Sequence, residues 1–296
     1  MDVTPENLRS IFVSLSTLFN RRLTTTPTQY TRVAMDVSST AAQNEYPKLE
    51  DMPGLREWIG DRVIHDLSGS TYAIKNKEFE GTIGVDRAKI EDDQIGFYGP
   101  ISEQLGLNTA EFPDQLTFGL LKKGNQVLCS DGQYFFDTDH PGFDENGGAI
   151  VVSNYQDGAG PAWFLIDDTQ VLKPLVFQKR RSFALTSLDK PDDGNVFHKK
   201  KFIYGVDGRC NVGFGMWQLA FMSRAELNPT NYALARAAMT SIRRRDGNIL
   251  NIRPRLLMFP GVLEAQARAL LAANNAAGAT NIWANTVEPL LVPGLG

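Results

Sequence analysis

The fold is decided by MPGLREWIGDRVIHDL (52–67) and TYAIKNKEFEGTIGVDR (71–87), which precede EDDQIGFYGP (91–100) and a helical run ending in FGLLKKG (118–124). The first stretch has helical periodicity, and the second alternates apolar and polar residues as strands do. A two-stranded flap between two helices cannot bury both of its faces and is only marginally stable alone. This order therefore predicts a subunit that is completed by contact with its neighbours.

The composition excludes several classes of protein. The chain has 296 residues, 42% of them hydrophobic, which is enough for one large domain or two ordinary ones. A formal net charge of −4 argues against a protein that wraps nucleic acid by neutralising phosphates. No run of about 18 uncharged apolar residues is present, so we expect no membrane span and no membrane partner. These features predict a soluble protein made in cytoplasm.

The stretch 52–67 is predicted to be an amphipathic helix that begins near Pro53. Its charged side carries Arg56, Glu57, Asp61 and Arg62. Glu57 and Asp61 form a like-charge i,i+4 pair, which would destabilise an isolated helix. The four charges therefore indicate a face that meets external partners. A solvated face without a partner fits the same spacing, and that alternative stays open.

Residues 72–86 are predicted to form a β-hairpin that extends from the subunit. Alternation places Tyr72 and Ile74 on one arm and Ile83 and Val85 on the other. The expected tip is the polar run Lys75, Asn76, Lys77 and Glu78. We expect the apolar side chains Ile74, Phe79 and Ile83 to be buried between subunits, with Lys75 and Lys77 reaching a neighbour.

The run from residue 99 to 124 is predicted to be one long helix, closed by Gly124 with Lys122 and Lys123 in its last turn. Pro113 interrupts the pattern and is expected to kink or break the helix. If continuous, the helix would be roughly 37 Å long at 1.5 Å per residue.

Flanking segments supply the rest of an α+β fold. Thr4 and Pro5 predict a first helix over residues 5–22, followed by a polar stretch that suits either an extended arm or a disordered tail. Strand patterns run from 162 to 221 and predict a mostly antiparallel sheet. After Asn228 the order helix, strand, helix, strand predicts a compact α/β unit.

A cluster of acidic residues near His140 raises the question of a metal or an active site. Asp137, Asp139, His140 and Asp144 resemble the start of a calcium loop, but no Glu stands at the twelfth position, where Gly148 is found. Asp and Asn side chains that hydrogen-bond their own backbone explain the loop as well. Cys129 and Cys210 lack C-x-x-C spacing. No P-loop, HExxH or nucleophile elbow occurs, so we expect no catalytic residue, no metal and no cofactor.

Several segments together resemble the major head (capsid) proteins of Mu-like tailed bacteriophages. They cover nearly the whole chain: TTPTQYTRVAM (25–35), the run 52–100, DGQYFFDTDHP (131–141), KPLVFQKRRSF (173–183), YGVDGRCNVGFGMWQLAF (204–221) and 231–271. The resemblance implies the Hong Kong 97-type capsid fold, with an N-terminal arm, an extended loop, a peripheral domain with a spine helix, and an axial domain.

Carried over to this chain, the resemblance implies six segments. They are the arm with the first helix (1–50), a peripheral-domain helix (51–68), the extended loop (69–88), the spine helix (89–124), a loop region with the peripheral sheet (125–222) and the axial domain (223–296). The implied function is a non-enzymatic subunit of the icosahedral shell that encloses a double-stranded DNA genome.

The resemblance also implies partners. They are copies of the chain as hexamers and pentamers, scaffold and portal proteins, decoration proteins, and packaged DNA met on the inner face without sequence recognition. Two alternatives stay open: an encapsulin-like cellular shell protein, and a metal-dependent hydrolase using Asp137, Asp139 and His140.

Overall fold

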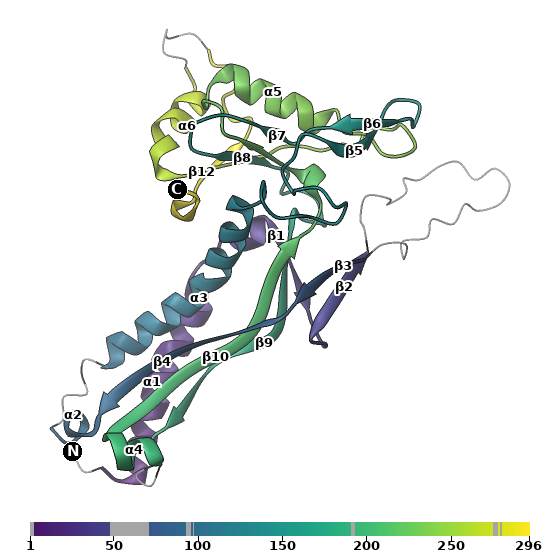
Figure 1. Ribbon diagram of the computed structural model, residues 1–296. Coiled ribbons are helices and arrows are strands. Elements are labelled where there is room, and N and C mark those ends of the chain that lie inside the picture. The colour runs from purple at the N-terminus through teal and green to yellow at the C-terminus, as the bar shows by residue number, and fades with distance from the viewer. Residues whose placement is uncertain are drawn as a thin grey trace.

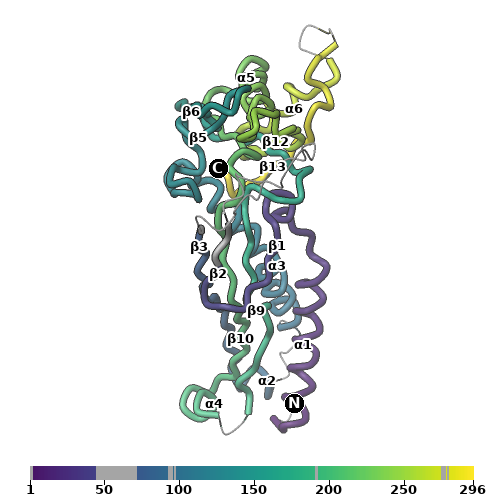
Figure 2. Tube along the Cα trace, turned by 90° about the vertical axis from the view of Figure 1, so that its right-hand side faces the viewer, coloured from purple at the N-terminus to yellow at the C-terminus, as the bar shows by residue number. Residues whose placement is uncertain are grey.

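The structure is a computed structural model that describes residues 3–47, 71–92, 96, 98–190, 193–274, 278 and 280–296. Both views show an elongated body of long strands and helices, with a second unit at the end where the C-terminus lies (Figures 1 and 2). None of the described helices is both long and apolar enough to span a membrane.

The elongated body is a four-stranded sheet with two helices packed along it. The strand order is β1 (Ala34–Ser38), β9 (Leu175–Leu188), β10 (Lys201–Phe214) and β4 (Lys77–Asp86). β1 is parallel to β9, whereas β10 is antiparallel to β9 and β4. Two short helices, α2 (Arg87–Glu91) and α4 (Gly194–Lys199), lie at the end of the body near the N-terminus (Figure 1).

Helix α1 (Pro5–Thr25) confirms the predicted first helix and continues one turn beyond residue 22. The Thr4 side chain accepts a hydrogen bond from the Asn7 N–H, which is the N-cap predicted from sequence. Its apolar side packs in a core cluster of Leu8, Ile11, Leu15, Val85, Ile90, Val196, Phe202 and Tyr204. This cluster joins α1 to the far end of the long sheet.

Helix α3 (Tyr98–Lys122) confirms the predicted long helix and runs through Pro113 without a break. Gly106 lets it approach α1, because a Cβ there would collide with the Phe19 carbonyl. One residue after the proline, the Asp114 carboxylate accepts the N–H of Tyr30 at 2.7 Å. Of the two effects predicted for Pro113, a kink or a break, the break is contradicted, because α3 is one continuous helix that packs along α1 and the sheet.

The predicted hairpin over residues 72–86 is wrong. β3 (Thr71–Lys75) pairs with β2 (Gln43–Pro47), whereas β4 pairs with β10 over its full length. The two strands are therefore separate, and Asn76 lies at the junction between them. Alternation identified the strands correctly, but it carries no information about which strand pairs with which.

The second unit contains a five-stranded sheet in the order β13 (Glu288–Leu291), β12 (Leu256–Phe259), β8 (Trp163–Ile166), β11 (Ala220–Ser223) and β7 (Tyr155–Gln156). Helices α5 (Pro229–Thr240) and α6 (Glu264–Leu271) belong to this unit, and a hairpin of β5 (His140–Phe143) and β6 (Ala149–Val152) projects from it (Figure 1). The Asn228 side chain accepts the Asn231 N–H and so caps α5.

The predicted boundary at residue 222 cuts through this second sheet. β8 precedes the boundary and β11 (Ala220–Ser223) spans it, yet β8 pairs with β12, which follows it. The strands predicted over 162–221 therefore divide between two sheets: β9 and β10 enter the long sheet, and β8 and β11 enter the second. All four residues of β8 are buried, which fits a central strand covered on both faces.

Candidate functional site

The β2–β3 ribbon is one of two two-stranded sheets among the described residues. Its antiparallel register runs from Gln43 opposite Lys75 to Pro47 opposite Thr71, and no third described strand joins it. It leaves the long sheet sideways (Figure 1). Residues 48–70, which join its two strands, lie outside the described residues. An isolated two-stranded ribbon needs a partner surface to be stable.

Polar side chains fix the root of the ribbon. The buried Asn76 donates to the Ser39 hydroxyl and to the Ala41 carbonyl, both at 2.9 Å. Gln178 donates to the Ile74 carbonyl at 3.1 Å, and Asn211 donates to the Lys75 carbonyl at 2.7 Å. These bonds join the ribbon to β9 and β10, so it leaves the body in a defined direction.

An apolar contact completes the root. Ile74 is 3% exposed and lies over Gly213 of β10. A Cβ at position 213 would collide with Ile74 and would also press on the Tyr72 ring. Tyr72 is half-buried, and burial raises the pKa of its hydroxyl. Gly213 is therefore required by close packing of strand on strand.

Three of the predicted intersubunit residues pack within their own subunit. Ile74 is 3% exposed, and Phe79 and Ile83 are partly buried, so most of the surface of these side chains is already covered. Phe79 packs edge to face on Phe112 of α3, with ring centroids 4.6 Å apart. Ile83 packs against the core cluster around α1. The side chains of Lys75 and Lys77 are exposed, as predicted. The predicted helix with Arg56, Glu57, Asp61 and Arg62 lies outside the described residues.

Arg32 links the two units of the fold. Its guanidinium donates to Asp168 at 2.7 and 2.5 Å and to Glu288 at 3.1 and 3.0 Å. Arg32 precedes β1 of the long sheet, whereas Glu288 begins β13 of the second sheet. A planar guanidinium that engages two carboxylates fixes their relative orientation better than a single ammonium would. Sequence reasoning missed this contact because the partners lie 136 and 256 residues away.

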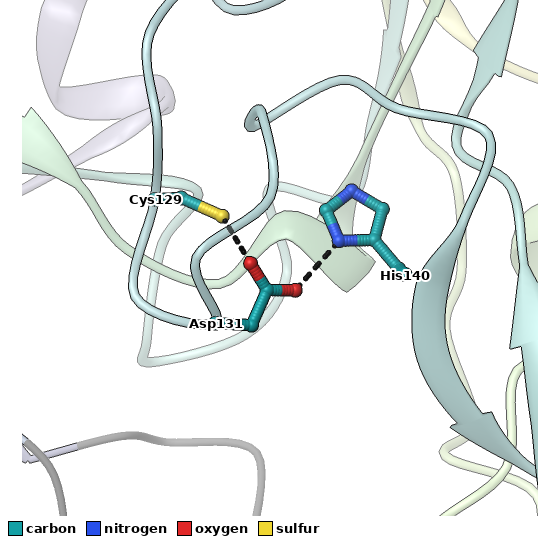
Figure 3. A group of neighbouring side chains, drawn as sticks. All are labelled: Cys129, Asp131 and His140. Atoms are coloured by element: carbon teal, nitrogen blue, oxygen red, sulfur yellow. Dashed lines mark hydrogen bonds and ion pairs between the residues drawn. The ribbon is translucent and has the colours of Figure 1, made fainter.

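His140 is part of a buried network, but not with the residues predicted. Its Nδ1 lies 2.7 Å from Asp131 Oδ2, and Cys129 Sγ lies 3.0 Å from Asp131 Oδ1 (Figure 3). The imidazole stacks on Trp217 with centroids 4.0 Å apart. Because the carboxylate lies between the thiol and the imidazole, the three groups form a hydrogen-bonded chain that fastens the loop before β5.

Asp137 and Asp139 do not join this network. Asp137 accepts the N–H groups of Tyr134 and Thr138, and Asp139 accepts from the exposed Gln133 amide. Asp144 likewise accepts the N–H groups of Asn146 and Gly148. The loop interpretation is therefore confirmed for Asp137 and Asp144, and the grouping of Asp137, Asp139 and His140 as a hydrolytic centre is wrong.

The network of Cys129, Asp131 and His140 should make the free energy of unfolding of the subunit depend on pH in the acidic range. Burial raises the pKa of Asp131, but hydrogen bonds from His140, Cys129 and the Gln133 N–H outweigh it and hold the pKa below its usual value. A carboxyl whose pKa is lowered by folding stabilises the protein above its unfolded pKa of about 3.9, and this stability is lost as pH falls through the folded pKa.

We therefore expect Asp131→Asn to lower the free energy of unfolding by about 1–3 kcal/mol at neutral pH. The deficit relative to wild type should shrink as the pH falls below the usual aspartate range, because the wild-type carboxyl is then protonated as well. Urea unfolding of the unassembled subunit at a series of pH values measures this. A deficit that does not change with pH would show that the ionised carboxylate is not responsible.

Residues 8–295 match the family described as Mu-like prophage major head subunit gpT. The chain belongs to this family. It is 40% identical over 277 residues to the Mu-like prophage FluMu major head subunit of Haemophilus influenzae, covering 91% of this chain and 90% of the relative. It is 37% identical over 277 residues to the major capsid protein of Escherichia phage Mu, with coverage of 92% and 91%.

Solved structures of phage heads agree with this family assignment. A chain in the procapsid of bacteriophage JBD30 matches with a TM-score of 0.88 and 42% identity, covering 99% of this chain and all of that one. A chain of the JBD30 capsid matches with a TM-score of 0.79 and 31% identity over the full length of both. The major head subunit described here thus has the Hong Kong 97-type capsid fold, and the resemblance read from sequence is confirmed.

Membership of this family settles the function class. The chain is a structural subunit of the head of a Mu-like phage and a component of the virion, and it is not an enzyme. The hydrolase and encapsulin-like alternatives are therefore set aside.

Proposed function

We propose that this subunit assembles into hexamers and pentamers of an icosahedral shell around a double-stranded DNA genome, and that the β2–β3 ribbon with residues 48–70 lies across the neighbouring subunit. The observation that carries the proposal is the ribbon itself: two paired strands held at the root and left without a third strand among the described residues. Surface of this kind is stabilised by a neighbour, and a closed shell repeats the contact many times.

In this proposal the contact residues are the charged residues predicted within 48–70, namely Arg56, Glu57, Asp61 and Arg62, together with the exposed residues at the ribbon root. Lys75 and Lys77 reach carboxylates on the neighbour, and Tyr72 adds a partly buried aromatic ring. Apolar burial by Ile74, Phe79 and Ile83 is not part of the contact, because those side chains are used inside the subunit.

Other partners follow from the head proteins that resemble this chain. One solved JBD30 capsid is described as decorated with minor capsid protein trimers. We propose that this subunit also meets decoration, scaffold and portal proteins during assembly in the host cytoplasm. Packaged DNA would face the inner surface without sequence recognition, because a net charge of −4 leaves no excess of positive charge to hold it.

The subunit expressed alone and concentrated is expected to form closed shells in electron micrographs. Pentameric and hexameric rings in a single particle lattice would support the proposed arrangement. Only monomers or open sheets, under conditions where the subunit is folded, would count against the proposed function.

A further inference from the structure

Strand β6 is exposed, and the proposed contact between the β2–β3 ribbon and a neighbouring subunit does not account for this exposed strand. None of its four residues is buried, and Ile150 and Val151 are 44% and 68% exposed. Neighbouring residues of a strand point to opposite faces, so apolar side chains are displayed on both sides of the hairpin. Exposed apolar strands of this kind are normally covered in the assembled protein.

The hairpin register identifies which backbone groups face outward. Asp144 donates its N–H to the Gly148 carbonyl at 2.8 Å, which makes that pair hydrogen-bonded. Hydrogen-bonded and non-hydrogen-bonded pairs alternate along an antiparallel ladder, so Ala149 and Val151 direct their N–H and C=O groups away from β5. Pro141, opposite Val151, agrees with this assignment because it has no N–H to donate.

The β5–β6 hairpin, which carries the free outer edge of β6, is held in place at its turn and at its root. Asp144 closes the turn by accepting two backbone N–H groups, and Gly142 lets the Val152 side chain lie directly on the β5 backbone. At the other end, His140 is fixed by Asp131 and Trp217. Because the turn and the root are both fixed, β6 is organised for pairing before any partner arrives.

We propose that the outer edge of β6 receives an extended segment of a second copy of this chain, which adds a strand to the β5–β6 hairpin. Among the described strands β6 pairs only with β5, so its outer edge is open. The partner is a second copy because the chain assembles with itself, and each subunit in a shell has neighbours at fixed positions. Backbone hydrogen bonds to Ala149 and Val151 supply the contact, and Ile150 and Val151 supply apolar surface.

The substitution Val151→Pro tests the backbone contact directly. Proline removes the outward N–H at position 151 and leaves the bonds to β5 intact, and it restricts Ile150 to the extended conformation that the strand already has. We expect a subunit with an unchanged circular dichroism spectrum that needs at least about fivefold higher concentration to form particles, the effect of losing one hydrogen bond.

Val151→Thr is the matched control, because threonine keeps the N–H and the β-branched shape, and it should assemble as wild type does. Normal assembly of the proline variant would overturn the proposal, and so would normal particles that fail only to bind a decoration protein. Wild-type subunits that form no particles would instead count against the proposed function, so the two failures are distinguishable.

If the proline variant does not fold, labelling of Val151→Cys decides the question. Cys129 and Cys210 are both buried, so a hydrophilic maleimide reports on the introduced thiol. The proposal predicts rapid labelling of free subunits and strong protection in particles. Equal labelling rates in the two states would overturn it.

Discussion

A subunit in which residues 48–70 are replaced by the four residues Thr-Asn-Gly-Thr is expected to fold and to form no shells. The Asn76 N–H donates to the Ala42 carbonyl, and alternation from that pair makes Pro47 and Thr71 a non-hydrogen-bonded pair. One added residue on each strand then supplies the hydrogen-bonded pair that a two-residue Asn-Gly turn closes, so the register of β2 and β3 is kept. Asn76, Gln178 and Asn211 would still hold the root. Thermal unfolding and electron microscopy of the same preparation separate folding from assembly.

The control for this variant is a deletion within residues 72–86, the segment that the sequence pattern predicted to be the protruding hairpin. Removing residues 73–84 takes away most of β4, which forms an edge of the long sheet through its pairing with β10. That deletion should unfold the subunit, whereas the turn replacement should not. Normal shells from the turn replacement would show that residues 48–70 are dispensable for assembly.

Ile74→Ala is expected to destabilise the free subunit by about 2–5 kcal/mol, the usual cost of truncating a buried aliphatic side chain. Ile74 is 3% exposed and fills the space above Gly213. The same cavity would loosen the ribbon root, so assembly should require a higher subunit concentration as well. Urea unfolding of the unassembled subunit measures the first effect, and light scattering measures the second.

Lys75→Ala is the comparison for this substitution, because Lys75 is the next residue on β3 and its side chain is exposed. Its effect on the free subunit should stay within roughly 0.5 kcal/mol, as for most surface substitutions. If Ile74→Ala left the free subunit as stable as wild type and impaired only assembly, Ile74 would be an interface residue, as the sequence pattern alone had indicated.

Local elements were predictable because their signals are local. Thr4 and Asn228 mark helix starts through hydrogen bonds that their side chains accept within one turn. Pro5 suits the first helical position because it has no N–H to donate. The periodicity of residues 99–124 was strong enough to define α3 in spite of Pro113. In these cases the residues that carry the signal are also the residues that form the element.

Strand pairing was not predictable in the same way. The stretch TYAIKNKEFEGTIGVDR has the composition of a hairpin with a polar tip, yet Asn76 marks a change of partner instead of a turn. The strand that pairs with β4, in place of the predicted partner β3, is β10, which begins more than a hundred residues later. Tertiary pairing of this kind overrides a local pattern, because alternation defines the two faces of a strand and not its neighbours.

The candidate site was predictable only in part. Exposure of Lys75 and Lys77 follows from their charge, but Arg32, Asn76, Gln178 and Asn211 look like ordinary surface residues in the sequence. Their roles depend on partners brought close by the fold, such as the Glu288 carboxylate and the Ile74 carbonyl. The contact between His140 and Asp131 was not predicted either.

In the proposed assembly, the β2–β3 ribbon and residues 48–70 lie on a neighbouring subunit. Electron cryomicroscopy of assembled particles tests it most directly, because the path of the chain between Pro47 and Thr71 can then be traced. We predict that this stretch crosses the boundary between subunits and contacts the adjacent copy in both pentamers and hexamers. A map in which it folds back on its own subunit, with no contact to the next, would contradict the account.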